Sequence, residues 1–214
     1  AQREGSASEF SSSLYLREPE DMRDPLVRRI AALAARAAGV PLDCAEPLCI
    51  TRYIAGQRYD WHYDDAYYER RATWLAYLTT VRAGGETVFP LAFPAPVVEP
   101  HKIPTAAEFR KFRERWPNAV SVSPAQGHAL LFFNRDEHNI QDQRSLHGSL
   151  PVEPANGPED EKWIVQVWLH DKPCPGVTGA WLDSPELPAG PQAAGETSHI
   201  AAAPLVCLPE LPAQ

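Results

Sequence analysis

Two residues in the stretch from Arg52 to Asp64 have the chemistry of metal ligands. His62 and Asp64 stand two positions apart, in a segment rich in aromatic residues that follows Gly56. On a β-strand, residues i and i+2 point to the same face, with Cα atoms about 6.6 Å apart. An imidazole and a carboxylate at this spacing can converge on one ion. Because two ligands hold a metal poorly, the pair predicts a third ligand elsewhere in the chain.

His147 is the best candidate for this third ligand. It lies beside Gly148 in a segment with Leu and Val on either side, as expected of a buried strand. A His-x-Asp pair with a distant histidine is the facial triad of non-haem Fe(II) sites, which leaves coordination positions open for chemistry. On these residues alone, an ordinary strand histidine explains His147 nearly as well. The other histidines considered lie in charged, turn, proline-rich or small-residue segments: His101, His128, His138 and His199.

Lys162 opens a second segment with functional chemistry. In the predicted strand from Lys162 to His170, alternation puts Trp163, Val165, Val167 and Leu169 on one apolar face. The other face mixes a cation, an amide, an indole and an imidazole, which is the mixture expected of a ligand pocket. A buried ammonium would need an anion. The alternative is a lysine in water at the mouth of the strand.

The rest of the chain predicts short strands around these residues. Turn signals such as Gly84-Gly85 separate β-like runs at residues 48–54, 59–64, 72–81, 86–89, 119–123, 129–133, 145–152 and 162–170. Many short strands at this spacing favour an antiparallel sandwich or jelly roll.

Two helices are expected beside these strands. Asp24 and Pro25 begin the first, with apolar positions at Leu26, Ile30, Leu33 and Ala37, and it ends at Gly39. Thr105 and Glu108 form a capping box that predicts a short helix reaching Trp116, inside a long insertion at residues 91–118.

The composition and charge of the chain limit which classes of protein it can belong to. The chain has 214 residues and a formal charge of −8, which suits a single domain with a real core and does not favour nucleic-acid binding. It has no apolar run long enough to span a membrane. Its four cysteines lack Cys-x-x-Cys spacing, which argues against structural zinc. One or two disulfides, the oligomeric state, and a cytoplasmic or secretory-pathway location all stay open.

Several motifs occur together in one order and resemble the catalytic domain of the prolyl 4-hydroxylases. They are Tyr53-x-x-Gly56-Gln57-x-Tyr59, His62-Tyr63-Asp64, residues 75–80, residues 84–90, Ser145-Leu146-His147-Gly148 and Lys162-Trp163. The resemblance covers roughly residues 12–172. It implies a double-stranded β-helix, the cupin-like jelly roll, and dependence on Fe(II), 2-oxoglutarate and O₂, with ascorbate as an expected addition. We therefore expect a loose arm at residues 1–11, a catalytic domain at 12–172 and a proline-rich tail at 173–214.

The resemblance also implies roles for individual residues. His62, Asp64 and His147 match the iron ligands. Lys162 matches the residue that pairs with the far carboxylate of 2-oxoglutarate, Tyr53 and Thr87 match hydroxyl donors to that carboxylate, and Trp168 matches an indole of the pocket. Positions near a peptide substrate are matched by Tyr59, Arg71 and His170, with Arg71 and His170 counted among the catalytic residues.

The implied activity is hydroxylation of peptidyl proline, with release of succinate and CO₂. A related 2-oxoglutarate oxygenase that acts on another residue or a small molecule is the alternative within enzymes. A non-catalytic β-sandwich that binds metal or peptide is the alternative outside them. The tail has eight prolines among the last 44 residues. It either covers strand edges or occupies the peptide groove, and the first is favoured.

Overall fold

The fold was analysed in a computed structural model of the chain. The structure describes residues 11–65, 69–92, 105–112, 114, 116, 119–154, 161–173 and 205–207. The predicted arm apart from Ser11, the tail apart from Pro173 and residues 205–207, and the residues 155–160 lie outside the described residues. Within the described part, no helix is long and apolar enough to cross a membrane.

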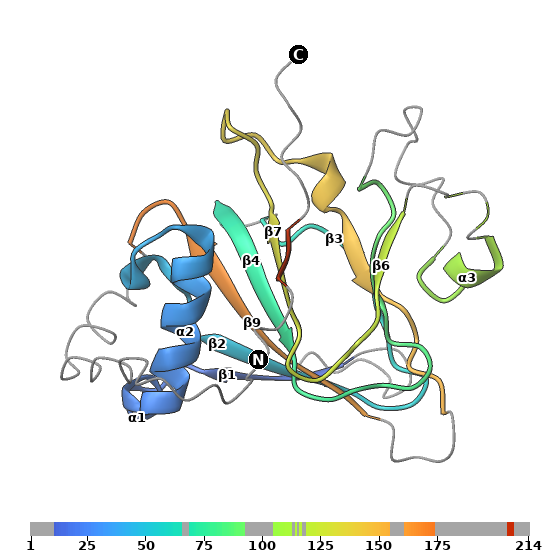
Figure 1. The fold of residues 1–214 in the computed structure, drawn as a ribbon, viewed down its shortest axis with the longest axis horizontal. Coiled ribbons are helices and arrows are strands. Elements are labelled where there is room, and N and C mark those ends of the chain that lie inside the picture. The colour runs from blue at the N-terminus through green and yellow to red at the C-terminus, as the bar shows by residue number, and fades with distance from the viewer. Residues whose placement is uncertain are drawn as a thin grey trace, which may run out of the picture.

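Two β-sheets make up most of the molecule (Figure 1), which confirms the predicted mainly β fold. The larger sheet has the strand order β1 (Ser12–Leu16), β2 (Leu48–Tyr53), β9 (Lys162–His170), β4 (Arg70–Tyr77), β7 (Ala129–Phe133) and β10 (Leu205–Cys207). The smaller sheet has the order β3 (Tyr59–His62), β8 (His147–Ser149), β5 (Thr87–Phe89) and β6 (Val120–Val122). All pairings are antiparallel except that of β10 with β7.

Apolar side chains fill the space between the two sheets. Tyr77, Phe132 and Ile164 from the larger sheet pack with Phe89 from the smaller one in a single buried cluster. Since alternate residues of a strand face opposite sides, the same strands send their other side chains outward. Val165 and Val167 of β9 pack there against the helices. Both faces of β9 are therefore buried, and Lys162 begins it on the inner face.

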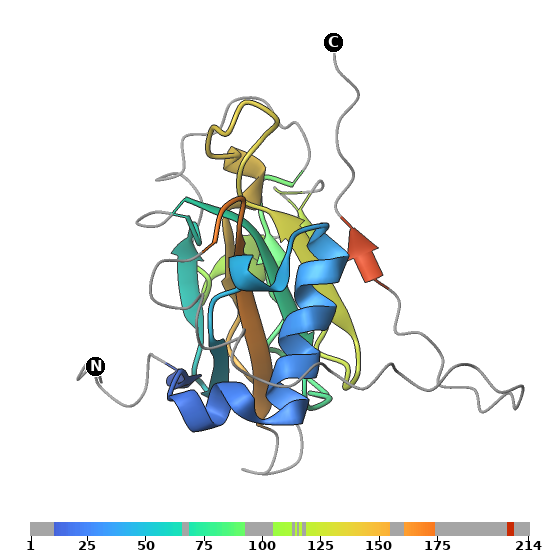
Figure 2. The same ribbon diagram turned by 90° about the vertical axis from the view of Figure 1, so that its left-hand side faces the viewer.

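Helix α2 (Pro25–Ala38) covers the outer face of the larger sheet, after the short α1 (Pro19–Arg23) and before η1 (Leu42–Cys44) (Figure 2). Its ends are as predicted: the Asp24 side chain accepts hydrogen bonds from the backbone N–H groups of Leu26 and Val27, and Gly39 ends the helix with φ of 70°. Of the four predicted apolar positions, Ile30 and Ala37 are partly buried against the core, whereas Leu26 and Leu33 are exposed. Leu26 is 63% exposed, and the buried residues are alanines, which let the helix approach the sheet closely: Ala31, Ala34, Ala35 and Ala38.

Two further elements differ from prediction. The long strand predicted at residues 145–152 is much shorter: Ser145 ends η4 (Gln143–Ser145), and the strand β8 that follows has three residues. Beyond β8, Val152 makes an isolated bridge with Gly84. The helix in the insertion, α3 (Phe109–Phe112), is shorter than expected. The Thr105 hydroxyl donates to the Glu108 side chain, and the helix begins only at Phe109. Phe109 still packs on Trp61, behind the smaller sheet.

The cysteines give no disulfide in the part of the chain that the structure describes. Cys44 and Cys49 are both buried. The side chains of Cys174 and Cys207 lie outside the described residues.

Candidate metal centre and co-substrate pocket

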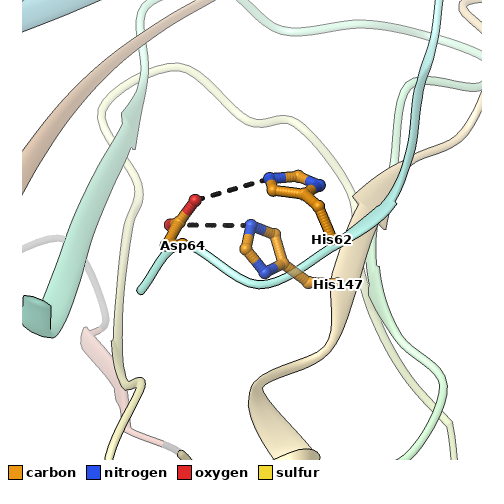
Figure 3. A group of neighbouring side chains, drawn as sticks. All are labelled: His62, Asp64 and His147. Carbon is orange, nitrogen blue, oxygen red and sulfur yellow. Dashed lines mark ion pairs between the residues drawn. The ribbon is translucent and has the colours of Figure 1, made fainter. Parts of the chain in front are cut away.

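The structure brings His62, Asp64 and His147 together at one end of the space between the sheets (Figure 3). His62 on β3 is paired directly opposite His147 on β8, so the two imidazoles start from neighbouring positions. Asp64 follows β3 by two residues and turns back toward both rings. One ligand atom from each residue lies within 4.8 Å of the other two. Two nitrogens and one oxygen at this separation can hold a single metal ion.

Backbone carbonyl groups set the orientation of both imidazoles. Nδ1 of His62 lies 2.9 Å from the Asp60 carbonyl oxygen, and Nδ1 of His147 lies 2.9 Å from that of Ser145. A carbonyl oxygen can only accept, so each Nδ1 carries the hydrogen and each Nε2 keeps its lone pair. Those Nε2 atoms are the ones that face Asp64, at 3.4 Å for His62 and 3.7 Å for His147.

The protonation states also suit metal binding. Burial acts to raise the pKa of Asp64, but His147, His62 and the Thr73 hydroxyl outweigh it and hold this pKa far below its ordinary value. Burial, together with the charge of His62, lowers the pKa of His147 to about 4. At neutral pH the site therefore offers a carboxylate and a neutral buried imidazole, the forms that coordinate a cation.

Lys162 lies deep between the sheets, and no carboxylate of the described residues forms an ion pair with it. Its side chain is 1% exposed, and Nζ donates a hydrogen bond to the Ser149 hydroxyl at 2.8 Å. The ammonium lies 4.9 Å from the ring centre of Tyr53 and 5.8 Å from that of Tyr77. Burial lowers the pKa of Lys162 to about 7, against the opposing effect of the Glu86 carboxylate. A buried cation with hydroxyl and aromatic neighbours suits an anionic ligand.

Hydroxyl groups from both sheets surround this ammonium. Tyr53 is paired opposite Lys162 on the larger sheet, and Thr87 is paired opposite Ser149 on the smaller one. The Tyr77 hydroxyl donates to Thr87 Oγ1 at 2.8 Å. This set fits a carboxylate, which binds through one charge partner and several O–H donors. Ser149 and Tyr77 were not among the predicted residues, although Ser149 shares a strand face with His147 at i+2.

Two glycines make this packing possible. A Cβ at Gly85, where φ is +68°, would lie 3.3 Å from Cδ of Lys162. A Cβ at Gly148 would lie 2.8 Å from the Trp61 ring and 2.8 Å from the Tyr59 carbonyl oxygen. Gly148 therefore lets β8 approach β3 closely enough for the two histidines to share one site.

The arginine that contacts the ligand segment is Arg70, next to the predicted Arg71, whose role at a substrate stays a prediction. Simple alternation would give Arg71 the inner face that Thr73 occupies. The β4–β9 pairing instead shifts register between Arg70 and Ala72, so that Arg70 lies opposite His170. Arg70 donates to the Asp64 carbonyl oxygen at 3.0 Å. Arg71 is 43% exposed and pairs with Asp171.

Glu46, which follows η1, holds Arg70 and His170 together. Its carboxylate accepts from Nε of Arg70 at 2.6 Å and from Nε2 of His170 at 2.7 Å. Burial acts to raise the pKa of Glu46, but these two partners outweigh it and lower that pKa. Glu46 was missed because no motif marks it.

Trp168 and Tyr59 lie on either side of the metal ligands. Trp168 is buried, stacks on Tyr15 with ring centres 6.1 Å apart, and lies under the Arg70 guanidinium at 4.0 Å. It is paired with Thr73, so it shares the inner face. Tyr59 is 41% exposed, with its ring centre 4.4 Å from that of His62. These positions agree with a pocket wall and a substrate contact, roles that stay predictions.

Neither of the other candidate histidines in the described part of the chain joins the ligand cluster. His138 is exposed in the loop after β7, and His128 precedes β7 at a turn. His101 and His199 lie outside the described residues.

A family model described as the 2OG-Fe(II) oxygenase superfamily, where 2OG is 2-oxoglutarate, matches residues 48–170. This range is more than half of the chain and contains all three candidate ligands, so the chain belongs to that superfamily. The donor set and the buried ammonium fit the Fe(II) and 2-oxoglutarate that the superfamily's description names. O₂ is the third reactant of such an oxygenase.

The relatives are prolyl 4-hydroxylases. Probable prolyl 4-hydroxylase 3 of Arabidopsis thaliana is 34% identical over 168 residues, 75% of this chain and 53% of the relative. Prolyl 4-hydroxylase 2 of the same plant is 35% identical over 158 residues, which are 69% of this chain and 49% of the relative. The chain thus spans about half the length of the curated relatives it matches. These matches confirm the resemblance predicted from the motifs.

A solved structure supports the fold. The viral collagen prolyl hydroxylase of Paramecium Bursaria Chlorella virus-1, in its 2OG complex, superimposes with a TM-score of 0.50 and 23% identity. The match covers 74% of this chain and 78% of that chain. It confirms the predicted jelly roll.

Proposed function

We propose that the chain is a Fe(II)- and 2-oxoglutarate-dependent dioxygenase that hydroxylates proline in a peptide or protein and releases succinate and CO₂. The observation that carries the proposal is the buried Lys162, which shares one interior with the His62, Asp64 and His147 triad. A metal-binding module would have no need for a buried ammonium beside its ligands. An oxygenase that uses a dicarboxylic co-substrate needs both features.

Each part of the site has a role in this proposal. Fe(II) would be held by His62, Asp64 and His147. When bound, it would supply the chemistry by which O₂ oxidises 2-oxoglutarate and hydroxylates the substrate. Lys162, Tyr53 and Thr87 would bind the far carboxylate of 2-oxoglutarate, with Ser149 and Tyr77 as further hydroxyl groups around them. The apolar cluster between the sheets would keep water away from the reacting groups.

The mouth of the site would receive the peptide. Tyr59 is exposed beside the metal ligand His62, while Arg70 and His170 form a polar edge on the opposite sheet. An aromatic ring and hydrogen-bonding side chains together suit an extended proline-containing segment. Proline as the target residue rests on the names of the relatives. Arg71, predicted from the resemblance, would contribute less than Arg70 because it is tied to Asp171.

Succinate formation tests the proposal. The chain with Fe(II), 2-oxoglutarate, O₂ and ascorbate, which we include in the proposal as a reductant, should form succinate much faster when a proline-rich peptide is added. If succinate formation rises with a free amino acid or another small molecule, and not with the peptide, the chain is a related oxygenase with a small-molecule substrate. If no succinate forms under any condition, the chain is a non-catalytic binding module.

A matched pair of lysine variants controls this assay. Lys162→Met should abolish the peptide-stimulated succinate, because it removes the buried charge and keeps the side-chain volume. Lys172→Met alters an exposed lysine outside the pocket and should retain the activity of the unaltered chain.

A further inference from the structure

Asn134 is a fully buried polar residue that no part of the proposed site explains. It follows β7 directly and is 0% exposed. Its backbone N–H donates to the Arg71 carbonyl oxygen at 2.8 Å, and its carbonyl oxygen accepts from the backbone N–H of Asp142 at 2.9 Å. Its side-chain Nδ2 donates to Thr73 Oγ1 at 3.0 Å. The backbone bonds would survive any substitution, so they do not explain why this residue is asparagine.

The Asn134 amide fixes the direction of a hydrogen bond to a metal ligand. An NH₂ group has no acceptor capacity, so Thr73 Oγ1 must accept from it. The single hydrogen of the Thr73 hydroxyl is then available for its other neighbour, Asp64 Oδ2, at 2.7 Å. Thr73 is also 0% exposed, so water does not compete for either bond. A chain of two hydrogen bonds therefore runs from Asn134 through Thr73 to Asp64.

The same amide has an unsatisfied end. Among the residues that the structure describes, Asn134 Oδ1 is buried without a hydrogen-bond donor. A buried amide oxygen without a partner destabilises the fold, whereas an apolar side chain of similar size would fill the space without that penalty. Packing alone thus disfavours asparagine at this position, and the bond to Thr73 is the feature that an apolar residue could not supply.

Asp64 Oδ1 lies 3.4 Å from His62 Nε2, and Oδ2 lies 3.7 Å from His147 Nε2. Both oxygens therefore reach the ligand cluster, and the Thr73 bond is what distinguishes them. We propose that Asn134 is a positioning residue for the metal centre, acting through Thr73 to engage Asp64 Oδ2 and leave Oδ1 as the oxygen that binds the ion. Asp64 then binds through a single oxygen. A carboxylate that used both oxygens would fill a further coordination position, which a facial triad keeps open for co-substrate and O₂. The inference rests on the proposed metal-dependent function and extends it to residues outside the ligand set.

Titration with Co(II), a spectroscopic substitute for Fe(II), tests the proposal without 2-oxoglutarate or peptide. Groups that orient a metal ligand typically contribute about 10- to 100-fold to metal affinity. Asn134→Ala and Thr73→Val should each weaken Co(II) binding by about tenfold, and Thr73→Ser, which keeps the hydroxyl, should stay within about threefold of the unaltered chain. The double variant should bind Co(II) no more weakly than Thr73→Val, because Asn134 acts only through that hydroxyl.

Control measurements separate this role from a structural one. Thr79→Val removes a part-buried bridging hydroxyl that does not contact the metal ligands, one that joins the Trp163 N–H to the Glu161 carbonyl oxygen, and should leave Co(II) affinity unchanged. Additive effects in the double variant, or an Asn134→Ala protein that melts earlier but binds Co(II) normally, would overturn the proposal. Failure of the unaltered chain to bind Co(II) would overturn it together with the metal site. The expected pattern in a protein inactive on peptide would leave the positioning role supported and only the substrate assignment wrong.

Discussion

The interior of the site and its mouth are built differently. In the interior, functional side chains come from strand positions paired directly across a sheet: His62 with His147, Tyr53 with Lys162, and Thr87 with Ser149. At the mouth, Arg70 faces inward because of a shift in strand register, and its partner Glu46 lies outside the named strands. Direct cross-strand pairs place the interior groups, although the β3–β8 pairing also shifts register between Tyr59 and the ligand His62. At the mouth, a register shift and a residue outside the named strands place the side chains that would meet a substrate.

This difference predicts that interior substitutions abolish cofactor binding, whereas substitutions at the mouth weaken only the use of peptide. The expected effects decrease from the metal ligands outward.

The largest effect is expected for His147→Ala. Only one imidazole and one carboxylate would remain, so metal affinity and turnover should fall together, by more than about 100-fold. His62→Ala should behave alike, and Asp64→Ala should also damage activity, less severely where water or halide takes the place of the carboxylate. Metal titration alongside succinate formation measures both quantities. Full hydroxylation by His147→Ala would remove this histidine from the site.

The second prediction concerns Lys162→Ala. The variant should bind 2-oxoglutarate roughly 10- to 100-fold more weakly, as expected for loss of a hydrogen bond to a charged group, and should keep its metal affinity. Lys162→Arg should recover only part, because a planar guanidinium does not fit the volume of an ammonium. Calorimetric titration of 2-oxoglutarate into the metal-loaded chain measures the change. Unaltered 2-oxoglutarate affinity would place the co-substrate elsewhere.

The third prediction is a pH dependence of 2-oxoglutarate binding. The pKa of Lys162 is about 7 in a setting that contains Glu86, Tyr53 and Tyr77. A bound carboxylate would raise that pKa, so binding above pH 7 must take up a proton. Affinity should be level below this pKa and should fall by up to about tenfold per pH unit above it. Lys162→Met should remove this pH dependence of 2-oxoglutarate affinity. The same pH profile in that variant would show that another group causes the dependence.

The fourth prediction compares neighbouring arginines at the mouth. Arg70→Ala should raise the KM for peptide by about tenfold, because it removes a part-buried charge that also contacts Trp168 and the Asp64 backbone. Arg71→Ala removes only an exposed ion pair with Asp171 and should change the KM by less than about twofold. The affinity for 2-oxoglutarate should stay the same in both. A larger effect for Arg71 would restore the role that the resemblance gave it.

The smallest effect is expected from truncation after Lys172. The removed segment contains β10, which pairs with β7 at the edge of the larger sheet. Exposure of that edge should lower the melting temperature by about a few degrees and leave the KM for a proline-rich peptide unchanged. A lower KM with unchanged melting would instead show that the tail competes for the peptide groove.

The sequence predicted the interior well because strand alternation and motif order carry that information. Each predicted ligand and pocket hydroxyl lies on a regular strand or within two residues of one. The sequence does not mark where the backbone departs from alternation: nothing in it indicates the register shift by which Arg70, rather than Arg71, lies opposite His170. Prediction failed where small residues determine packing, as in α2, whose buried face consists of alanines rather than the larger Leu26 and Leu33.

Isotope transfer from labelled dioxygen tests the central claim most directly. The metal-loaded chain, with 2-oxoglutarate and a proline-rich peptide, should place one labelled oxygen atom in the hydroxyl of a prolyl residue and the other in succinate. Mass spectrometry of both products measures this, and Lys162→Met should yield neither. Labelled succinate with an unmodified peptide would contradict prolyl hydroxylation, and a lack of label in both products would contradict the oxygenase itself.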